Sequence, residues 1–250
     1  MAGGVGSRFW PMSRNARPKQ FLDILGTGKT LIQQTYERFL QVCPKENIIV
    51  VTNADYTSLV LEQLPDMKPD QVLSEPSRRN TAPCIAYAAN KILKRNPDAN
   101  MVVAPSDHVI LKEQAFVDAV KGCLDFTVDK DVLLTLGIKP SRPDTGYGYI
   151  QFIDDKTEQV NKISKVKTFT EKPDLEMAKF FLQTGEFLWN AGIFIWSAKS
   201  IVKAFKEHLP EMDAIFSEGQ AAYDTAAEND FIHKAYEQCT NISIDFAIME

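Results

Sequence analysis

Apolar residues in the first half of the chain fall either in short continuous runs or in longer stretches with helical spacing. The runs Asn47–Thr52 and Met101–Pro105 are rich in β-branched residues, which is typical of parallel strands buried on both faces. Apolar positions recur every three or four residues elsewhere, which predicts helices over Leu31–Val42, Thr81–Leu93 and Glu113–Thr127. This alternation predicts an α/β fold with a parallel sheet and right-handed crossovers.

Beyond about residue 130 the predicted strands become longer and the gaps between them shorter. Strand-forming residues cover Val132–Ile138, Tyr147–Phe152, Lys162–Thr170 and Phe187–Trp196. Helices are expected over Leu175–Leu182, Lys199–Glu207 and Asp230–Gln238. No Gly/Ser-rich or Pro-rich linker separates the two halves, so we expect one mixed sheet in a single domain spanning residues 1–250.

Composition narrows the classes of function. A hydrophobic fraction of 44% and a charged fraction of 24% exclude a disordered or fibrous chain. Lys and Arg number 28 against 33 Asp and Glu, and no long basic run occurs, so nucleic acid is not an expected partner. The four cysteines form no C-x-x-C pair, and no stretch approaches the ~20 apolar residues that span a bilayer. We therefore expect a cytoplasmic protein with no membrane partner.

The opening segment Ala2–Arg8 holds three glycines and an arginine. Glycine lets backbone N–H groups curl around an anion because no Cβ stands in the way. Further cations follow closely at Arg14, Arg17 and Lys19, among stiffening prolines. The pattern indicates a polyphosphate site, although a flexible turn and a solvated basic stretch have the same composition.

Single polar residues at strand ends and inside strands are the other candidates for chemistry. Asp107 follows the Met101–Pro105 strand, at the end where ligands of open α/β sheets collect, and a carboxylate suits Mg²⁺. A helix cap is an equally good interpretation of Asp107 from the residues alone, and Asn80 is also a candidate helix N-cap. Asn190 lies in an aromatic strand, where an amide needs hydrogen-bond partners.

Several segments carry a family resemblance. The segment Ala2–Phe21 resembles GGxGxRxWPxSRxxxPKQF, the loop of the mannose-1-phosphate guanylyltransferases, which are sugar-phosphate nucleotidyltransferases. Segments similar to others of that family follow in its order at Glu75–Pro83, Ala104–His108, Phe169–Pro173, Trp189–Phe194 and Ser243–Glu250. The resemblance covers nearly the whole chain.

The resemblance implies both a fold and a reaction. The fold is a Rossmann-like three-layer α/β/α nucleotidyltransferase fold with a mixed, mostly parallel central sheet. The reaction transfers GMP from GTP to α-D-mannose 1-phosphate by Mg²⁺-assisted in-line attack, giving GDP-mannose and pyrophosphate. Positioning and charge neutralisation would supply most of the acceleration. A homodimer is the expected assembly.

The resemblance also implies a role for individual residues. It makes Arg8, Lys19 and Asp107 the catalytic residues, with Asp107 as the metal ligand and Arg8 on the pyrophosphate leaving group. Nucleotide-binding positions are expected at Gly3, Gly4, Gly6, Arg8, Lys19, Glu75, Asn80, Thr81 and Ser106. Positions that bind the sugar phosphate are expected at Gly146, Tyr147, Gly148, Glu171, Lys172 and Asn190.

The sequence departs from the family's pattern at both ends. Family members usually begin with an apolar strand, whereas Met1 directly precedes Ala2, and the family's GWSD segment with its second metal ligand does not occur. We therefore expect a catalytic domain without that first strand and without the C-terminal part of the family's chain. Asp245 lies near the C-terminal end, but the motif match does not make it the second ligand.

Two other functions stay open on the sequence. One is a nucleotidylyltransferase for another pair of substrates, dTTP or UTP with glucose 1-phosphate, because base choice rests on few hydrogen bonds. The other is a non-catalytic regulatory subunit that binds a nucleotide sugar. The presence of Arg8, Lys19, Asp107, Glu171 and Lys172 argues against the second.

Overall fold

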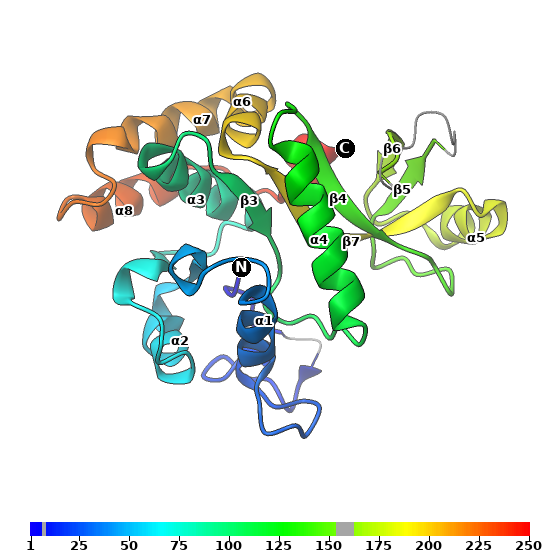
Figure 1. The fold of residues 1–250 in the computed structure, drawn as a ribbon, viewed down its shortest axis with the longest axis horizontal. Coiled ribbons are helices and arrows are strands. Elements are labelled where there is room, and N and C mark those ends of the chain that lie inside the picture. Colours follow the sequence, from blue (N-terminus) through cyan, green and yellow to red (C-terminus); the bar gives the residue numbers. More distant parts are fainter. Residues whose placement is uncertain (7–8, 154–162) are drawn as a thin grey trace.

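The computed structural model describes residues 1–6, 9–153 and 163–250, which form an α/β fold with helices on both faces of the strands (Figure 1). The strands are β1 (Val50–Asn53), β2 (Val72–Glu75), β3 (Asn100–Val103), β4 (Leu133–Ile138), β5 (Tyr149–Phe152), β6 (Val166–Thr170) and β7 (Phe187–Ser197). The helices are α1 (Leu31–Phe39), α2 (Thr57–Gln63), α3 (Thr81–Arg95), α4 (Glu113–Thr127), α5 (Leu175–Thr184), α6 (Ala198–His208), α7 (Pro210–Ser217) and α8 (Glu228–Gln238). Within the described residues, no helix is both long and apolar enough to cross a membrane.

The strands are hydrogen-bonded as two sheets. One is the parallel pair β1–β2, and the other has the order β3-β7-β5-β6 with β4 also paired to β7. The pairs of this second sheet are antiparallel. The long strand β7 runs opposite to β3, β4 and β5, and β5 runs opposite to β6. The α/β class and the mixture of parallel and antiparallel pairing follow the prediction. The parallel part is smaller than expected, because parallel strands are confined to β1–β2 among the described residues.

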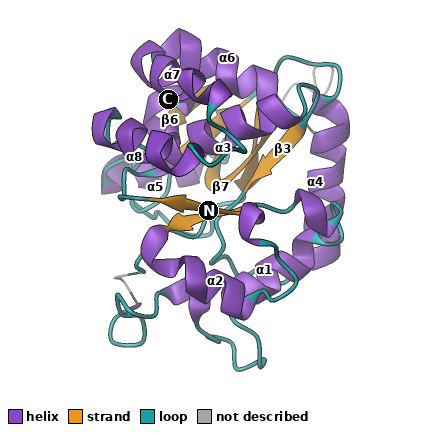
Figure 2. Ribbon diagram, turned by 90° about the vertical axis from the view of Figure 1, so that its left-hand side faces the viewer, coloured by secondary structure: helices purple, strands orange, loops and turns teal. Residues whose placement is uncertain are grey.

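Met1 and Ala2 connect the two sheets. Ala2 N donates to the oxygen of Val51 in β1 at 2.7 Å, and the Met1 ammonium donates to the oxygen of Ala104, just after β3, at 2.8 Å. Burial lowers the pKa of this ammonium. Figure 2 shows the N-terminus near the centre of the molecule, between α1 and α2 and the layer that contains α3. The glycine segment therefore starts between the carboxyl ends of β1 and β3.

Burial with a period of two along β7 creates the layers. Phe194 and Trp196 belong to a core shared with α3, α6 and α7, whereas Ile193 and Ile195 pack with residues of α4 on the opposite face. Successive side chains of a strand point to opposite faces, so one strand supplies both cores. Figure 1 shows α3, α6, α7 and α8 together on one side, with β5, β6 and α5 at the far end of β7.

Local signals account for where most elements begin and end. Helix α4 has the predicted bounds. Strand β1 begins at Val50 instead of Asn47 because Lys45–Asn47 forms a 3-10 turn. Helix α1 ends at Phe39 instead of Val42, where backbone N–H groups bond back to form turns. The predicted strand start at Lys162 lies outside the described residues.

Candidate active site

The glycine segment is fixed by its carbonyl groups. Gln20 is a buried side chain whose Nε2 donates to the oxygens of Ala2 at 2.7 Å and Gly4 at 2.9 Å. Thr52 Oγ1 donates to the same Ala2 oxygen at 3.0 Å. Carbonyls held inward in this way are the arrangement that lets the N–H groups of a glycine segment face an anion. Sequence reasoning missed Gln20, although the PKQF motif contains it.

Two glycines of this segment lie in tight surroundings. A Cβ on Gly3 would lie 3.1 Å from Glu75 Oε2, and one on Gly6 would lie 2.7 Å from Lys19 Cβ. Gly6 also has a φ of 63°, in the left-handed region that favours glycine. Glycine is therefore required at Gly6, whereas a Cβ on Gly3 would demand a small retreat of the Glu75 carboxyl. Phosphate binding by this segment stays a prediction.

Lys19 lies against Asp107, although the two residues are 88 positions apart. Lys19 Nζ is 3.2 Å from Asp107 Oδ2 and 3.2 Å from the Asp107 carbonyl oxygen. The side chains are 22% and 36% exposed, so both can be reached from solvent. The segment Ala2–Phe21 and the residues just after β3 therefore meet in space. Arg8 lies outside the described residues, and its role on the leaving group stays a prediction.

Ser106 supports the turn that presents Asp107. Its N–H donates to the Met1 oxygen at 3.1 Å, and its carbonyl accepts from Thr35 Oγ1 at 3.3 Å. The residue is buried. These contacts give Ser106 a structural role, and its predicted contact with nucleotide stays a prediction.

Glu75 is a buried carboxyl behind Gly3. It is 7% exposed and accepts a hydrogen bond at 2.8 Å from the hydroxyl of Tyr236 in α8. Burial raises the pKa of Glu75 to about 7, and the Tyr236 hydrogen bond and the Met1 ammonium oppose this shift. The carboxyl thus supports the glycine segment from the protein side, and a direct contact with the nucleotide base stays a prediction.

Asn80 and Thr81 use their side-chain oxygens at the start of α3. Asn80 has a φ of 68° and its Oδ1 accepts from Thr81 N, as the N-cap interpretation predicts. Thr81 Oγ1 accepts from Ile244 N at 2.9 Å. The predicted hydrogen bonds of these residues to ribose or base therefore have to use their remaining capacity.

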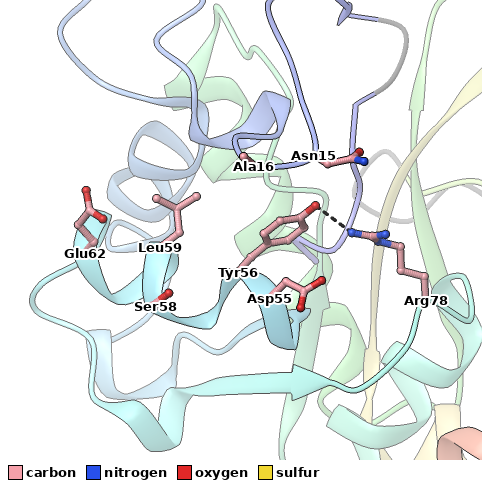
Figure 3. Close-up of a pocket in the computed structure, with 8 residues that line it drawn as sticks. All are labelled: Asn15, Ala16, Asp55, Tyr56, Ser58, Leu59, Glu62 and Arg78. Atoms are coloured by element: carbon pink, nitrogen blue, oxygen red, sulfur yellow. Dashed lines mark hydrogen bonds between the residues drawn. The ribbon is translucent and has the colours of Figure 1, made fainter.

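A polar pocket lies beyond the ends of β1 and β2 (Figure 3). Its volume is about 380 Å³. Asn15 comes after the glycine segment, Asp55 and Tyr56 follow β1, and Arg78 follows β2. Arg78 donates to the Tyr56 hydroxyl at 2.8 Å and its guanidinium lies 5.6 Å from the Tyr56 ring centre. Arg78 comes from between the predicted nucleotide-binding positions Glu75 and Asn80, but the pocket does not include Glu75, Asn80 or Thr81.

The predicted sugar-side residues form one cluster beside β7. Asn190 N donates to the Gly148 oxygen at 2.8 Å, and a Cβ on Gly148 would collide with Glu171. Glu171 is 8% exposed and forms an ion pair with Lys172, which is 54% exposed. The structure thus brings together Gly148, Glu171, Lys172 and Asn190, although their binding of a sugar phosphate is untested.

Gly146 and Tyr147 belong to the turn at the edge of this cluster. Gly146 N donates to Asp144 Oδ1 at 2.9 Å. The Tyr147 ring, 42% exposed, lies 5.0 Å from the Trp189 ring. The turn is therefore ordered by the protein itself, and its contact with a sugar stays a prediction.

A C-terminal segment links the nucleotide side with the sugar side. Ile242 and Ile244 are hydrogen-bonded to the start of α3, and the next residue, Asp245, accepts from Asn190 Nδ2 at 2.7 Å. Sequence reasoning assigned no role to Asp245. Its position in the Ser243–Glu250 match was the available signal, but only the fold places it beside Asn190.

The described residues fit a divalent metal only with help from other ligands. No group of three or more His, Cys, Asp or Glu side chains converges among them. Asp107 is a partly exposed carboxylate next to the glycine segment. Mg²⁺ commonly takes one or two carboxylates and completes its shell with water and substrate phosphates. Asp107 therefore suits a metal held largely by a bound triphosphate.

Comparisons with known proteins identify the family of the chain. Residues 1–236 match the family described as nucleotidyl transferase. The chain is 38% identical over 257 residues to a mannose-1-phosphate guanylyltransferase of Klebsiella pneumoniae, covering 100% of this chain and 53% of that protein. A mannose-1-phosphate guanylyltransferase of Escherichia coli shares the same identity and coverage. The chain thus spans about half the length of the curated relatives it matches.

Two solved structures share the fold. One is described as a mannose-1-phosphate geranyltransferase from Thermus thermophilus, with a TM-score of 0.87, 30% identity, and coverage of 100% of this chain and 69% of that one. The other is described as a mannose-6-phosphate isomerase from Helicobacter pylori, with a TM-score of 0.76, 28% identity, and coverage of 95% and 90%. These likenesses support the predicted fold class.

Proposed function

The chain belongs to the nucleotidyl transferase family, and from this premise we propose that it transfers GMP from GTP to α-D-mannose 1-phosphate, giving GDP-mannose and pyrophosphate. The observation that carries the proposal is the meeting of Lys19 and Asp107 beside the glycine segment. A cation, a carboxylate and backbone N–H groups at one sheet edge suit a metal-bound polyphosphate.

The reaction requires the chain to hold both substrates so that the attacking oxygen lies in line with the bond that breaks. A phosphate oxygen of mannose 1-phosphate forms a bond to the α-phosphorus of GTP. The bond from that phosphorus to the bridging oxygen breaks, and pyrophosphate leaves with the electron pair. Effective positioning of this kind can supply about 7–11 kcal/mol of the barrier.

Each part of the site has a task in this proposal. The N–H groups of Gly3, Gly4 and Gly6 face the triphosphate, and Lys19 neutralises charge on it. Arg8 stabilises the leaving pyrophosphate. Enzymes of this family generally use a divalent metal, and Mg²⁺ held at Asp107 would supply charge neutralisation at the phosphates.

The sugar phosphate lies in the cluster beside β7 in this proposal. Glu171 accepts hydrogen bonds from sugar hydroxyls, and Lys172 meets the phosphate. Gly148 has no Cβ, so the sugar can approach its backbone closely. This arrangement puts the attacking phosphate between the sugar cluster and the glycine segment.

The base lies toward the pocket of Figure 3. Asp55 supplies a carboxylate that can accept from the N–H groups of guanine, and Arg78 supplies donors for its acceptors. The polar lining supports a nucleobase as the guest. A cytoplasmic location and a homodimer remain predictions.

An Asp107→Asn variant tests the proposal. We expect wild-type chain to release pyrophosphate from GTP and mannose 1-phosphate in the presence of Mg²⁺, and the variant to lose at least about 10²-fold in kcat. Asp129→Asn, at an exposed position, is the matched control and should keep wild-type turnover. Circular dichroism and thermal melting check that both variants fold.

Three results would contradict the proposal. Turnover with dTTP or UTP and glucose 1-phosphate that equals or exceeds turnover with GTP and mannose 1-phosphate would reject the substrates. Binding of GDP-mannose without any pyrophosphate release would indicate a regulatory subunit. Conversion of mannose 6-phosphate without any nucleotidyl transfer would reject the reaction class.

A further inference from the structure

Asp245 lies in the sugar-side cluster although it comes from the end of the chain. It begins a π-helical turn, Asp245–Met249, and its Oδ1 accepts from Asn190 Nδ2 at 2.7 Å. Glu171 is near enough to act on its charge, and Lys172 also acts on it. Two carboxyl groups from distant segments therefore face one small region beside β7.

This arrangement is costly for a purely structural residue. Burial and the charge of Glu171 both raise the pKa of Asp245, while the Asn190 hydrogen bond, a hydrogen bond from the backbone N–H of Asp245 itself and the charge of Lys172 lower it. Among the described side chains, Asn190 is the one that donates a hydrogen bond to the Asp245 carboxylate. A partly desolvated carboxylate with few donors gains when a ligand brings hydroxyl groups to it.

We propose that Asp245 is a sugar-recognition residue, whose carboxylate accepts a hydrogen bond from a ring hydroxyl of the hexose 1-phosphate. This inference rests on the proposed function and names a further residue of the same site. Glu171 and Asp245 then accept from different hydroxyls of one hexose, because both carboxyls lie near Asn190 but come from separate segments.

Asn190 is the positioning residue for Asp245. Its Oδ1 accepts from Thr135 Oγ1 at 3.0 Å and from Gly192 N at 3.0 Å. These two bonds fix the orientation of the amide and turn Nδ2 toward Asp245. One amide hydrogen serves Asp245, and the second N–H remains available to the sugar hydroxyl that the sequence predicted for Asn190.

The chain before Asp245 fixes its position relative to the nucleotide side. Ile242 O accepts from Ala82 N at 3.1 Å, and Ile244 N donates to Thr81 Oγ1 at 2.9 Å. Both partners lie in the first turn of α3, which begins at the predicted nucleotide-binding residue Thr81. The carboxylate of Asp245 is therefore held between the two substrate regions and not at a loose chain end.

The test compares Asp245→Asn with wild type in substrate binding and turnover. We expect a tenfold or greater rise in the KM for mannose 1-phosphate, with the KM for GTP within twofold of wild type. Calorimetric titration with mannose 1-phosphate should show the same loss of affinity. Asp230→Asn, an exposed position on α8, is the matched control and should change neither value.

Deoxy analogues of mannose 1-phosphate separate recognition from simple anchoring of the chain end. Wild type should bind the analogue that lacks the recognised hydroxyl more weakly than it binds mannose 1-phosphate. The Asp245→Asn variant should bind that analogue almost as well as it binds mannose 1-phosphate. If Asp245 only anchors the segment, every analogue will lose affinity by the same factor in the variant. That result would overturn the inference.

The outcomes distinguish this inference from the proposed function. If wild type binds no sugar 1-phosphate in calorimetry and releases no pyrophosphate, the proposed function fails and the inference falls with it. If wild type binds mannose 1-phosphate and Asp245→Asn binds it equally well, the inference alone is overturned. Equal melting temperatures for the two proteins would show that the comparison concerns binding and not folding.

Discussion

Replacing Gly148 with alanine should separate the function of the sugar cluster from its stability. A Cβ at this position would come too close to Glu171 Oε2, and would lie 3.3 Å from Phe169 Cζ and 3.4 Å from Asn190 Cβ. The Glu171 carboxylate is the end of a flexible side chain, so it can retreat while the backbone stays in place. It has to move by about 1 Å to restore ordinary van der Waals contact.

Gly148→Ala should reduce the catalytic rate more than the stability, because it displaces one positioning side chain and leaves the backbone in place. Displacing a positioning group by about 1 Å can lower a rate by about 10²-fold. Fitting one methyl group into a site that can adjust costs about 1 kcal/mol of unfolding free energy, toward the low end of the range for overpacking. We therefore expect kcat/KM for mannose 1-phosphate to fall by about 10–10²-fold, with only a small change in melting temperature.

The assay measures pyrophosphate release while the two substrates are varied separately, together with thermal melting. Gly122→Ala is the control, because a Cβ on Gly122 in α4 meets nothing within 4 Å. It should leave turnover unchanged. If Gly148→Ala keeps kcat/KM for mannose 1-phosphate within twofold of wild type, Glu171 does not have to hold its present position for sugar binding. A fall in the affinity for GTP alone would show that the cluster acts on GTP and not on mannose 1-phosphate.

Two further predictions concern the glycine segment and its support. Gly6 has a left-handed φ and lies close to Lys19, so Gly6→Ala should destabilise the chain by about 1–3 kcal/mol and weaken GTP binding. Denaturant unfolding would measure the loss of stability, and calorimetry the loss of GTP affinity. Unchanged GTP affinity would argue against a phosphate role for this segment. Burial raises the pKa of Glu75 to about 7 from an ordinary value of 4.5. Between these pH values the folded chain binds more protons than the unfolded chain, so the contribution of Glu75 to stability falls as pH rises. Glu75→Gln should therefore gain stability relative to wild type, by at most about 3 kcal/mol, between about pH 5 and about pH 8; a stability difference that does not depend on pH would show that Glu75 titrates normally.

The buried position of Glu75 shows where sequence reasoning reached its limit. The motif that contains it was identified, and Glu75, its first residue, is the last residue of β2. Its carboxyl nevertheless points to Tyr236 of α8, 161 positions later. No local pattern could indicate that partner, because helix α8 comes against β2 only when the chain has folded.

The sequence by itself determined the alternation of strands and helices, the bounds of α4, and the glycine segment with its nearby cations, because these depend on periodicity and on the conformational freedom of neighbouring residues. The tertiary structure alone decided the antiparallel pairing around β7, the meeting of Lys19 with Asp107, and the contact of Asn190 with Asp245. Those contacts join residues 88 and 55 positions apart. Packing of whole layers brings such residues together, and the spacing of residues along the chain contains no direct signal for it.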